Sequence, residues 1–181
     1  LYKLYDKNWL NEWYLDKKTK EDYYKNGKRI LKEFFEQFQK NPPKILKLNN
    51  VLALEMPFNL KIGEYNFFGV IDRIDEGEKG IKILDYKTGN PKERLEAEDK
   101  AQLLIYQIAA EEVLKINPKE LAYCYLENGS QISFLGSDLE KRERKEKIIS
   151  QIEAIKTGDF KATPGWQCQY CDFKDICDYV Q

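Results

Sequence analysis

Histidine is absent from this chain of 181 residues. None of its side chains can therefore supply an imidazole as a general base or as a metal ligand. An excess of charge is also missing, because 30 Lys and Arg stand against 31 Asp and Glu, for a net charge of -1. This balance excludes a uniformly basic nucleic-acid binder but leaves room for a local basic groove. No apolar run approaches the roughly 20 residues that a membrane-spanning helix needs, and no secretory or lipidation motif is visible.

Cysteine is scarce and unevenly placed. Three of the four cysteines, Cys168, Cys171 and Cys177, crowd the end of the chain with the spacing C-x2-C-x5-C. Neighbouring thiolates are stable beside iron or zinc, so this spacing favours a metal or iron–sulfur site in a reducing compartment such as the cytoplasm. Three unrelated buried cysteines are the alternative. Cys124 lies within an expected strand and is typical of an ordinary core residue.

Hydrophobic periodicity predicts an α/β protein with one mixed sheet flanked by helices. We expect helices over 5–39 (in two segments split near 17–19), 92–115 and 137–156, and strands over 51–62, 65–75 and 80–89. A hairpin over 120–136 is expected to turn at Asn128-Gly129. The predicted organisation is an N-terminal helical segment over 1–50, a core over 51–160 and a cysteine-rich tail over 161–181.

Two acids and an amine interrupt the apolar pattern of the second and third strands. A strand period of two places Asp85 and Lys87 on one face, and it places Asp72 on a face with Phe68 and Val70. If the two strands pair, the two carboxylates lie side by side and repel each other unless a cation lies between them. Hard oxygen ligands favour Mg²⁺ or Mn²⁺. A plain Asp–Lys salt bridge at a strand end is the alternative.

Further polar residues occur at positions that point toward the same place. Gln102 and Tyr106 are four residues apart and therefore share a helix face, which suits contact with phosphate or base. A core tyrosine with a hydrogen-bonded glutamine would give the same pattern. Glu55 is an acid within an apolar strand and a candidate third carboxylate, or else an exposed residue of an edge strand.

One basic cluster requires a separate interpretation. The helix over 137–156 carries five basic residues in seven positions, interrupted by Glu143 and Glu146. The interruption favours a solvated helix face over a DNA groove. The five residues are Lys141, Arg142, Arg144, Lys145 and Lys147.

The stretches "GVIDRID", "ILDYKTG" and "QLLIY" together resemble motifs of the PD-(D/E)XK nucleases, in the RecB-like branch. That branch includes nuclease domains of bacterial helicase–nuclease complexes and the CRISPR-adaptation exonucleases. The resemblance implies a restriction-endonuclease-like core and a Mg- or Mn-dependent DNA nuclease. Asp72, Asp85 and the backbone carbonyl of Tyr86 would hold the metal, and Lys87 would be catalytic.

The same resemblance assigns the remaining candidates. Glu55 corresponds to the acid of the first core strand, while Gln102 and Tyr106 match the helix motif that supports the site and contacts DNA. It also implies an exonuclease working in DNA repair or recombination with a helicase domain or subunit. Members of this branch usually carry a metal-ligating histidine, which this chain lacks. A catalytically inactive DNA-binding module is therefore the alternative function.

The cysteine tail resembles that of the iron–sulfur members of the branch, in which a fourth cysteine far upstream completes a 4Fe–4S cluster. Because the chain begins with Leu1 and not with Met, we expect an excised or processed piece whose histidine and fourth cysteine lie upstream. We then expect the cluster to bind weakly or not at all to this piece. Zinc in the tail is a second possibility.

Overall fold

The structure of the protein is a computed structural model, and it describes residues 1–14, 16–158 and 160–179. The chain forms two compact units, Leu1–Arg144 and Lys145–Gln181, which are described separately. The first unit contains the whole sheet. Helix α4 (Asp138–Thr157) begins in the first unit and continues into the second.

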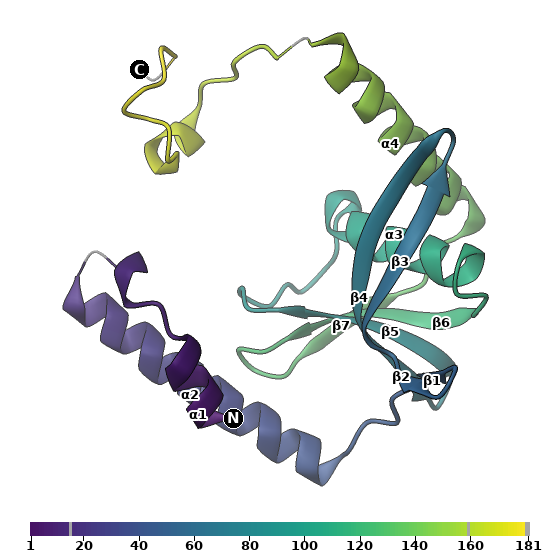
Figure 1. Ribbon diagram of the computed structural model, residues 1–181, viewed down its shortest axis with the longest axis horizontal. Coiled ribbons are helices and arrows are strands. Elements are labelled where there is room, and N and C mark those ends of the chain that lie inside the picture. The colour runs from purple at the N-terminus through teal and green to yellow at the C-terminus, as the bar shows by residue number, and fades with distance from the viewer. Residues whose placement is uncertain (15, 159, 180–181) are drawn as a thin grey trace. The chain divides into compact units, whose positions relative to one another are not determined.

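One five-stranded sheet organises the first unit, with strand order β3-β4-β5-β6-β7 (Figure 1). Strands β5 and β6 are parallel, and all other neighbours in this sheet are antiparallel, so the predicted mixed sheet is confirmed. Helix α3 (Ala97–Glu112) provides the long crossover that a parallel pair requires. The strands are β3 (Leu54–Ile62), β4 (Tyr65–Gly77), β5 (Gly80–Lys87), β6 (Pro118–Tyr125) and β7 (Gln131–Phe134).

Helices α2 (Lys17–Lys40) and α3 begin where a polar side chain satisfies a free backbone N–H group. The Asp16 carboxylate accepts a hydrogen bond from the Thr19 backbone at 2.8 Å and begins α2. The Asp99 carboxylate accepts from the Glu96 backbone at 3.1 Å, so α3 begins at Ala97 and not at the predicted residue 92. The other helical elements are α1 (Tyr2–Asn8), α2 (Lys17–Lys40), α3 (Ala97–Glu112) and the short 3₁₀ turns η1 (Asn11–Trp13) and η2 (Trp166–Tyr170).

The expected strand over 51–62 is divided in the structure. Its first residues form a separate small hairpin, β1 (Lys47–Leu48) with β2 (Val51–Leu52). The turn between them uses Asn49 and Asn50 at φ 50° and 65°, which asparagine tolerates better than most residues. Pro57 does not interrupt β3, because β3 is an edge strand and needs no ladder donor on its open side.

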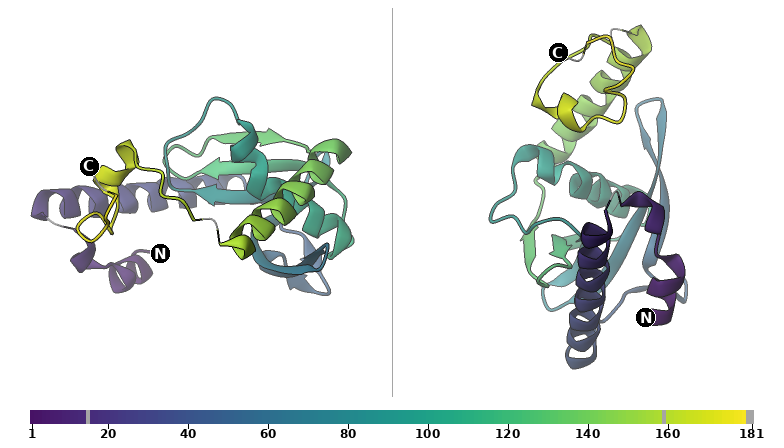
Figure 2. Two further views of the ribbon diagram at one scale, coloured as in Figure 1. Left: turned by 90° about the horizontal axis from the view of Figure 1, so that it is seen from above. Right: turned by 90° about the vertical axis from the view of Figure 1, so that its left-hand side faces the viewer.

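The two faces of the sheet contact different helices (Figure 2). Helix α3 buries Leu103 and Ile108 against one face, where Ile83 is fully buried. On the opposite face, the Phe34 ring of α2 meets the Tyr86 ring edge-on, with centroids 5.8 Å apart. Since residues 85, 86 and 87 alternate between faces, Asp85 and Lys87 lie on the α3 side.

The apolar face of β4 that carries Phe68 and Val70 is exposed to solvent in its first half. Phe68 is 80% exposed and Val70 is 42% exposed, whereas Ile71 and Ile74 are fully buried. Phe68 and Val70 lie in the part of β4 that pairs with β3 alone, and their partners on β3, Asn59 and Pro57, are exposed as well. One face of this two-stranded ribbon therefore faces solvent.

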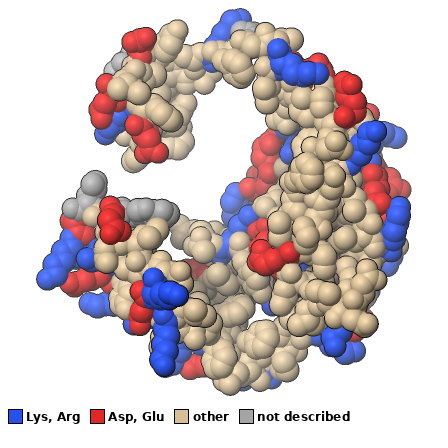
Figure 3. Space-filling view, viewed as in Figure 1, with Lys and Arg blue, Asp and Glu red and all other residues tan. Residues whose placement is uncertain are grey.

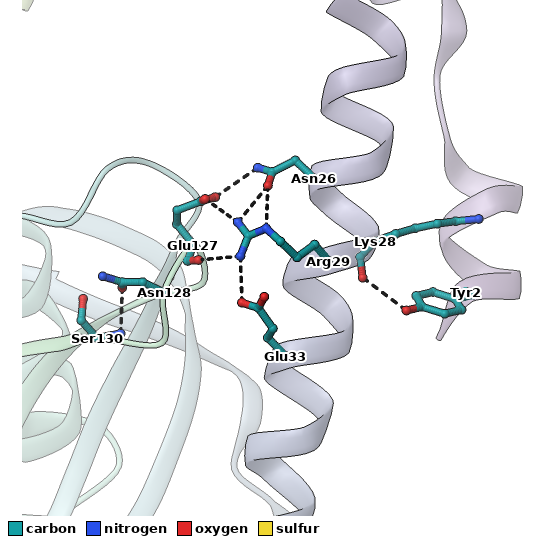
Figure 4. Close-up of polar contacts among 8 residues, drawn as sticks. All are labelled: Tyr2, Asn26, Lys28, Arg29, Glu33, Glu127, Asn128 and Ser130. Carbon is teal, nitrogen blue, oxygen red and sulfur yellow. Dashed lines mark hydrogen bonds and ion pairs between the residues drawn. The ribbon is translucent and has the colours of Figure 1, made fainter.

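Helix α2 is joined to the turn after β6 by a polar cluster (Figure 4). Arg29 lies at its centre, with Nη2 of the guanidinium 2.5 Å from Glu127 Oε1 and Nη1 2.8 Å from Glu33 Oε2. Asn26 donates a further hydrogen bond to Glu127 at 3.1 Å. Gly129 continues the turn at φ 70°, as expected for an Asn-Gly hairpin.

The face of the molecule drawn in Figure 3 carries both signs of charge interspersed, in keeping with the composition. None of the helices in the described ranges combines the length with the apolar character that a bilayer crossing demands.

Candidate active site

The two acids predicted from neighbouring strands are brought together by the β4–β5 register. Arg73 pairs with Leu84, and one step further along this antiparallel ladder Asp72 and Asp85 are level with each other. The Asp72 carboxylate accepts a hydrogen bond from the Tyr86 backbone N–H at 2.8 Å. Asp85 is only 2% exposed. The sequence expectation that these two carboxylates are neighbours therefore agrees with the geometry.

Lys87 is held on the same face by two polar contacts and one aromatic ring. Its Nζ lies 2.8 Å from Asp85 Oδ2 and donates a hydrogen bond to Gln102 Oε1 at 2.7 Å. It also lies 4.7 Å from the centroid of the Tyr123 ring. These contacts fix the direction of a long, otherwise flexible side chain.

Helix α3 supplies the other half of this polar network. Gln102 Nε2 donates to the Tyr106 hydroxyl at 2.9 Å, as their spacing on one helix face predicts. Tyr106 is buried against the Phe58 ring, with centroids 6.1 Å apart. The series of polar contacts from Asp85 through Lys87 and Gln102 to Tyr106 is therefore continuous.

Electrostatics in this network favour neutral phenols and disfavour the charged form of Asp85. Burial raises the pKa of Asp85 above its usual value, the Lys87 ammonium opposes that shift, and the charge of Asp72 adds to it. Burial, together with the Asp85 charge, raises the pKa of Tyr106 to about 12. Tyr106 is accordingly a protonated phenol at neutral pH, and it can donate a hydrogen bond.

The residues present fit a hydrated divalent cation. Apart from its ion pair with Lys87, Asp85 Oδ2 is buried without a hydrogen-bond donor among the described residues. The Lys87 ammonium offsets part of the cost of burying this carboxylate oxygen, and a divalent cation beside Asp72 and Asp85 would offset the rest. Within the described ranges, no group of three or more His, Cys, Asp and Glu side chains is arranged around a common point. Mg²⁺ often uses only one or two carboxylates and completes its shell with water and substrate phosphate.

Glu55 is not gathered into a three-carboxylate group with Asp72 and Asp85 among the residues described. It lies between the paired residues Leu54 and Met56 of β3, so it is level with Asp72, but its side chain is exposed. Its backbone has φ 47°, which interrupts the regular alternation of the edge strand. A role for Glu55 in the site stays a prediction.

A second buried cluster lies behind the acids, on the α2 face of the sheet. Arg73 is 8% exposed, donates to Asp75 Oδ2 at 2.8 Å and contacts the Tyr86 hydroxyl. Burial raises the pKa of Asp75, and the Arg73 guanidinium opposes the rise. Tyr86 therefore connects this cluster, through its own backbone N–H, to Asp72.

Two residues that contact the site or its supports are not among those predicted from the sequence. Tyr123 faces Asp85 across the parallel β5–β6 pair and donates from its hydroxyl to the Asp99 backbone carbonyl at 2.6 Å. Arg73 lies inside the motif "GVIDRID", but its spacing does not indicate that it holds Tyr86 behind the two acids. Alternation with Cys124 would have placed Tyr123 on the α3 face, but the parallel register was needed to bring it beside Lys87.

The cysteine tail belongs to the second unit. Cys168 and Cys171 lie at η2, and Cys177 follows, but the three thiols form no metal-binding group in the part of the chain that is described. Several large apolar side chains of the tail are exposed, including Trp166, Tyr170 and Ile176. Cys124 is buried in β6, as predicted.

Comparison with known families identifies the superfamily to which this fold belongs. The sequence model of the PD-(D/E)XK nuclease superfamily matches residues 2–178, and the chain therefore belongs to that superfamily. The predicted α/β nuclease-like fold is confirmed by this match and by the observed mixed sheet.

Individual relatives are more distant. One of them is a subunit of the ATP-dependent helicase/deoxyribonuclease of Clostridioides difficile (strain 630). The two chains are 34% identical over 101 residues, which is 49% of this chain and 9% of that protein. This similarity supports the RecB-like branch. The Gene 69 protein of Mycobacterium phage L5 is 27% identical over 132 residues, 69% of this chain and 44% of that protein. The chain thus spans less than half the length of either curated relative.

Among solved structures, the crystal structure of SSO0001 is similar at 20% identity with a TM-score of 0.47. The similarity covers 83% of this chain and 68% of that one.

Proposed function

We propose that the protein is a metal-dependent DNA nuclease that hydrolyses phosphodiester bonds. The observation that carries the proposal is the continuous network that joins Asp72, Asp85, Lys87 and Gln102 at one end of the sheet. Membership of a nuclease superfamily supports the hydrolytic class. Water forms the new bond to phosphorus, the phosphorus–oxygen ester bond breaks, and the products are a phosphate monoester and a hydroxyl end.

Asp72, Asp85 and the Tyr86 backbone carbonyl are the groups that would hold Mg²⁺ or Mn²⁺. Such an ion supplies Lewis acidity toward the phosphate and a lowered pKa for a bound water. Lys87 faces the same region and stabilises the charge that develops on the phosphate oxygens. Gln102 accepts from the Lys87 ammonium, so it fixes where that charge lies. Tyr106 in turn holds Gln102.

Removing one acid or the amine tests the proposal directly. Linear single-stranded DNA should be degraded by the wild-type protein in Mn²⁺, and Asp85→Ala or Lys87→Ala should abolish this activity. A general electrostatic contribution of this kind is worth about 10²- to 10³-fold, so gel or fluorescence assays resolve it. Lys61→Ala, which removes an exposed lysine of β3, is the matched control and should cut normally.

A DNA-binding module without activity is the second candidate. It is favoured by the absence of histidine from the chain and by the lack of a three-ligand metal group among the described residues. If wild type and both variants bind DNA equally and none of them cuts it, the binding module is correct.

The finer parts of the proposal rest on relatives. The similarity to a protein named as a subunit of a helicase/deoxyribonuclease supports a helicase partner and a DNA substrate. We further propose exonuclease action in DNA repair or recombination, as the resemblance to the RecB-like branch implies. Degradation of linear but not circular single-stranded DNA would identify an exonuclease. Protection of circular DNA is therefore the expected result, and nicking of circles would contradict it.

The cysteine tail is proposed to hold three of the four ligands of a 4Fe–4S cluster. Its exposed apolar residues support this, since a short segment that lacks a hydrophobic core needs another stabilising element, such as a bound metal cluster. The chain of 181 residues is expected to purify with little iron. A brown sample with a full complement of iron would contradict that expectation.

A further inference from the structure

A cavity of about 630 Å³ opens directly beside Lys87 in the first unit. Its walls come from the loop after β5, the first turns of α3, the end of β6 and the beginning of α4. Gln102 belongs to this wall as well as to the polar network described above. The cavity is therefore continuous with the candidate active site. Among its lining residues are Lys87, Asn90, Lys92, Asp99, Tyr125 and Arg144.

The three cations of this cavity differ in how their charge is offset. Lys87 pairs with Asp85, and Lys92 pairs with Asp99. Arg144 Nε is buried and has no hydrogen-bond acceptor in the parts of the chain that are described. A guanidinium whose Nε has no acceptor is not held there by a protein carboxylate or carbonyl, so an anion in the cavity can offset its charge through the terminal nitrogens.

Arg144 also stands apart from the other basic residues at the start of α4. Lys141 is occupied by Glu111 at 2.6 Å and Asp138 at 2.9 Å. Arg142 is exposed, as a solvated helix face predicts. Arg144, two positions further, instead lines the cavity. The sequence expectation of a solvated face therefore does not extend to this residue.

We propose that this cavity binds the backbone of a single DNA strand next to the scissile phosphate, and that Arg144 donates to a non-bridging oxygen of the adjoining phosphate. The proposal rests on the proposed nuclease function, because Lys87 marks where the scissile phosphate lies. The planar guanidinium matches phosphate geometry. A cavity of about 630 Å³ is the size of an ordinary small-ligand pocket, so it accommodates a short stretch of one strand and not the width of a duplex. Tyr123 and Tyr125, each 4% exposed, are among its lining residues.

Binding measured without cutting tests the assignment. A fluorescein-labelled oligodeoxythymidine is titrated in EDTA with wild type, Arg144→Gln and Arg142→Gln at several salt concentrations. Arg144→Gln should bind about tenfold more weakly, as expected for one charge-assisted hydrogen bond. It should also lower the slope of log K against log salt by about 0.7, the value for one phosphate contact on a single strand. Arg142→Gln, the same change two residues away on an exposed position, should alter neither quantity.

Arg144→Lys keeps the positive charge but lacks the planar guanidinium with its paired N–H donors. Compared with Arg144→Gln, it should therefore restore the salt slope but only part of the affinity. Thermal unfolding of each variant confirms that it is folded. Equal binding by Arg144→Gln and Arg142→Gln would overturn the proposal, even if Mn²⁺-dependent cutting is observed. Tighter Arg144-dependent binding of oligouridine, or of a duplex of equal length, would overturn it too. Arg144-dependent binding without any cutting would support the cavity and refute the nuclease function.

Discussion

The backbone and the side chain of Tyr86 act on opposite faces of the sheet. The backbone N–H donates to Asp72 on the α3 face, while the hydroxyl contacts Arg73 and the ring packs on Phe34 on the α2 face. Arg73 is itself paired with Asp75, and both side chains are about nine-tenths buried. The position of a candidate metal ligand therefore depends on a buried ion pair that the metal would not touch.

Replacing Arg73 by Met should lower the free energy of unfolding by about 3–5 kcal/mol, because it leaves the Asp75 carboxylate buried without its partner. Urea unfolding at neutral pH measures this loss. Arg29→Met removes the same group from an exposed pair with Glu127 and should cost about 1 kcal/mol or less. Equal losses of unfolding free energy in Arg73→Met and Arg29→Met would show that burial of the ion pair does not determine the cost of breaking it.

The loss should also depend on pH. Arg73 opposes the rise in the pKa of Asp75 that burial causes, so its removal raises that pKa further above the usual 3.8. When the pKa of Asp75 is higher in the folded state than in the unfolded state, the stability falls as the pH rises from the unfolded-state pKa through the folded-state pKa. The deficit of Arg73→Met should therefore be full at neutral pH and should shrink as the pH falls toward 3.8.

Much of the candidate site could be predicted from local periodicity. A period of two set Asp85 and Lys87 on one face, and an interval of four set Gln102 beside Tyr106. The role of Tyr123 depends on parallel pairing with β5, and that of Arg144 on the rotation of a helix. Neither can be obtained from spacing, because both are set by packing between distant segments.

Among the elements, the β3–β4 ribbon is the least regular part of the sheet, and it supports the site through Phe58. Gly69 is paired with Phe58, and a Cβ built at Gly69 would lie 2.3 Å from the Phe58 ring. The same ring packs against Tyr106. The absence of a side chain at Gly69 is therefore what allows Phe58 to reach the helix.

Gly69→Ala should cost about 1–3 kcal/mol of unfolding free energy, because the buried ring must move. Urea denaturation gives the magnitude, and adding Phe58→Leu should recover part of the loss. Gly89→Ala is the matched control, since a Cβ there meets nothing within 4 Å. A neutral Gly69→Ala would show that the ring can shift freely.

The order and type of the elements were predictable, but several boundaries were not. The hydrophobic periodicity predicted the helices and the strands, and the Asn128-Gly129 pair predicted the turn between β6 and β7. The start of α3 depends on the Asp99 carboxylate capping the Glu96 backbone. The exposed face of β4 depends on which strand covers it, and strand order cannot be read from alternation.

For the whole molecule, the tail contributes little buried apolar surface. Trp166 and Tyr170 are 77% and 79% exposed, and Ile176 is 80% exposed. Deleting 161–181 should therefore leave the thermal midpoint unchanged within about 2 °C, as differential scanning calorimetry would show. Replacing Cys168, Cys171 and Cys177 by Ser should behave in the same way. A large fall in the midpoint in either variant would mean that the thiols bind a metal in the purified protein.

The ion pair behind the acids borders a cavity of about 260 Å³ that Phe34, Arg73 and Cys124 help to line. This cavity lies on the α2 face, away from the candidate catalytic groups. A small molecule that filled it and displaced the Tyr86 ring would move the Tyr86 backbone N–H. It would thereby move the Asp72 carboxylate, which accepts a hydrogen bond from that N–H. If the proposed DNA hydrolysis is correct, such a molecule should inhibit it without competing with DNA, and raising the DNA concentration should not relieve the inhibition.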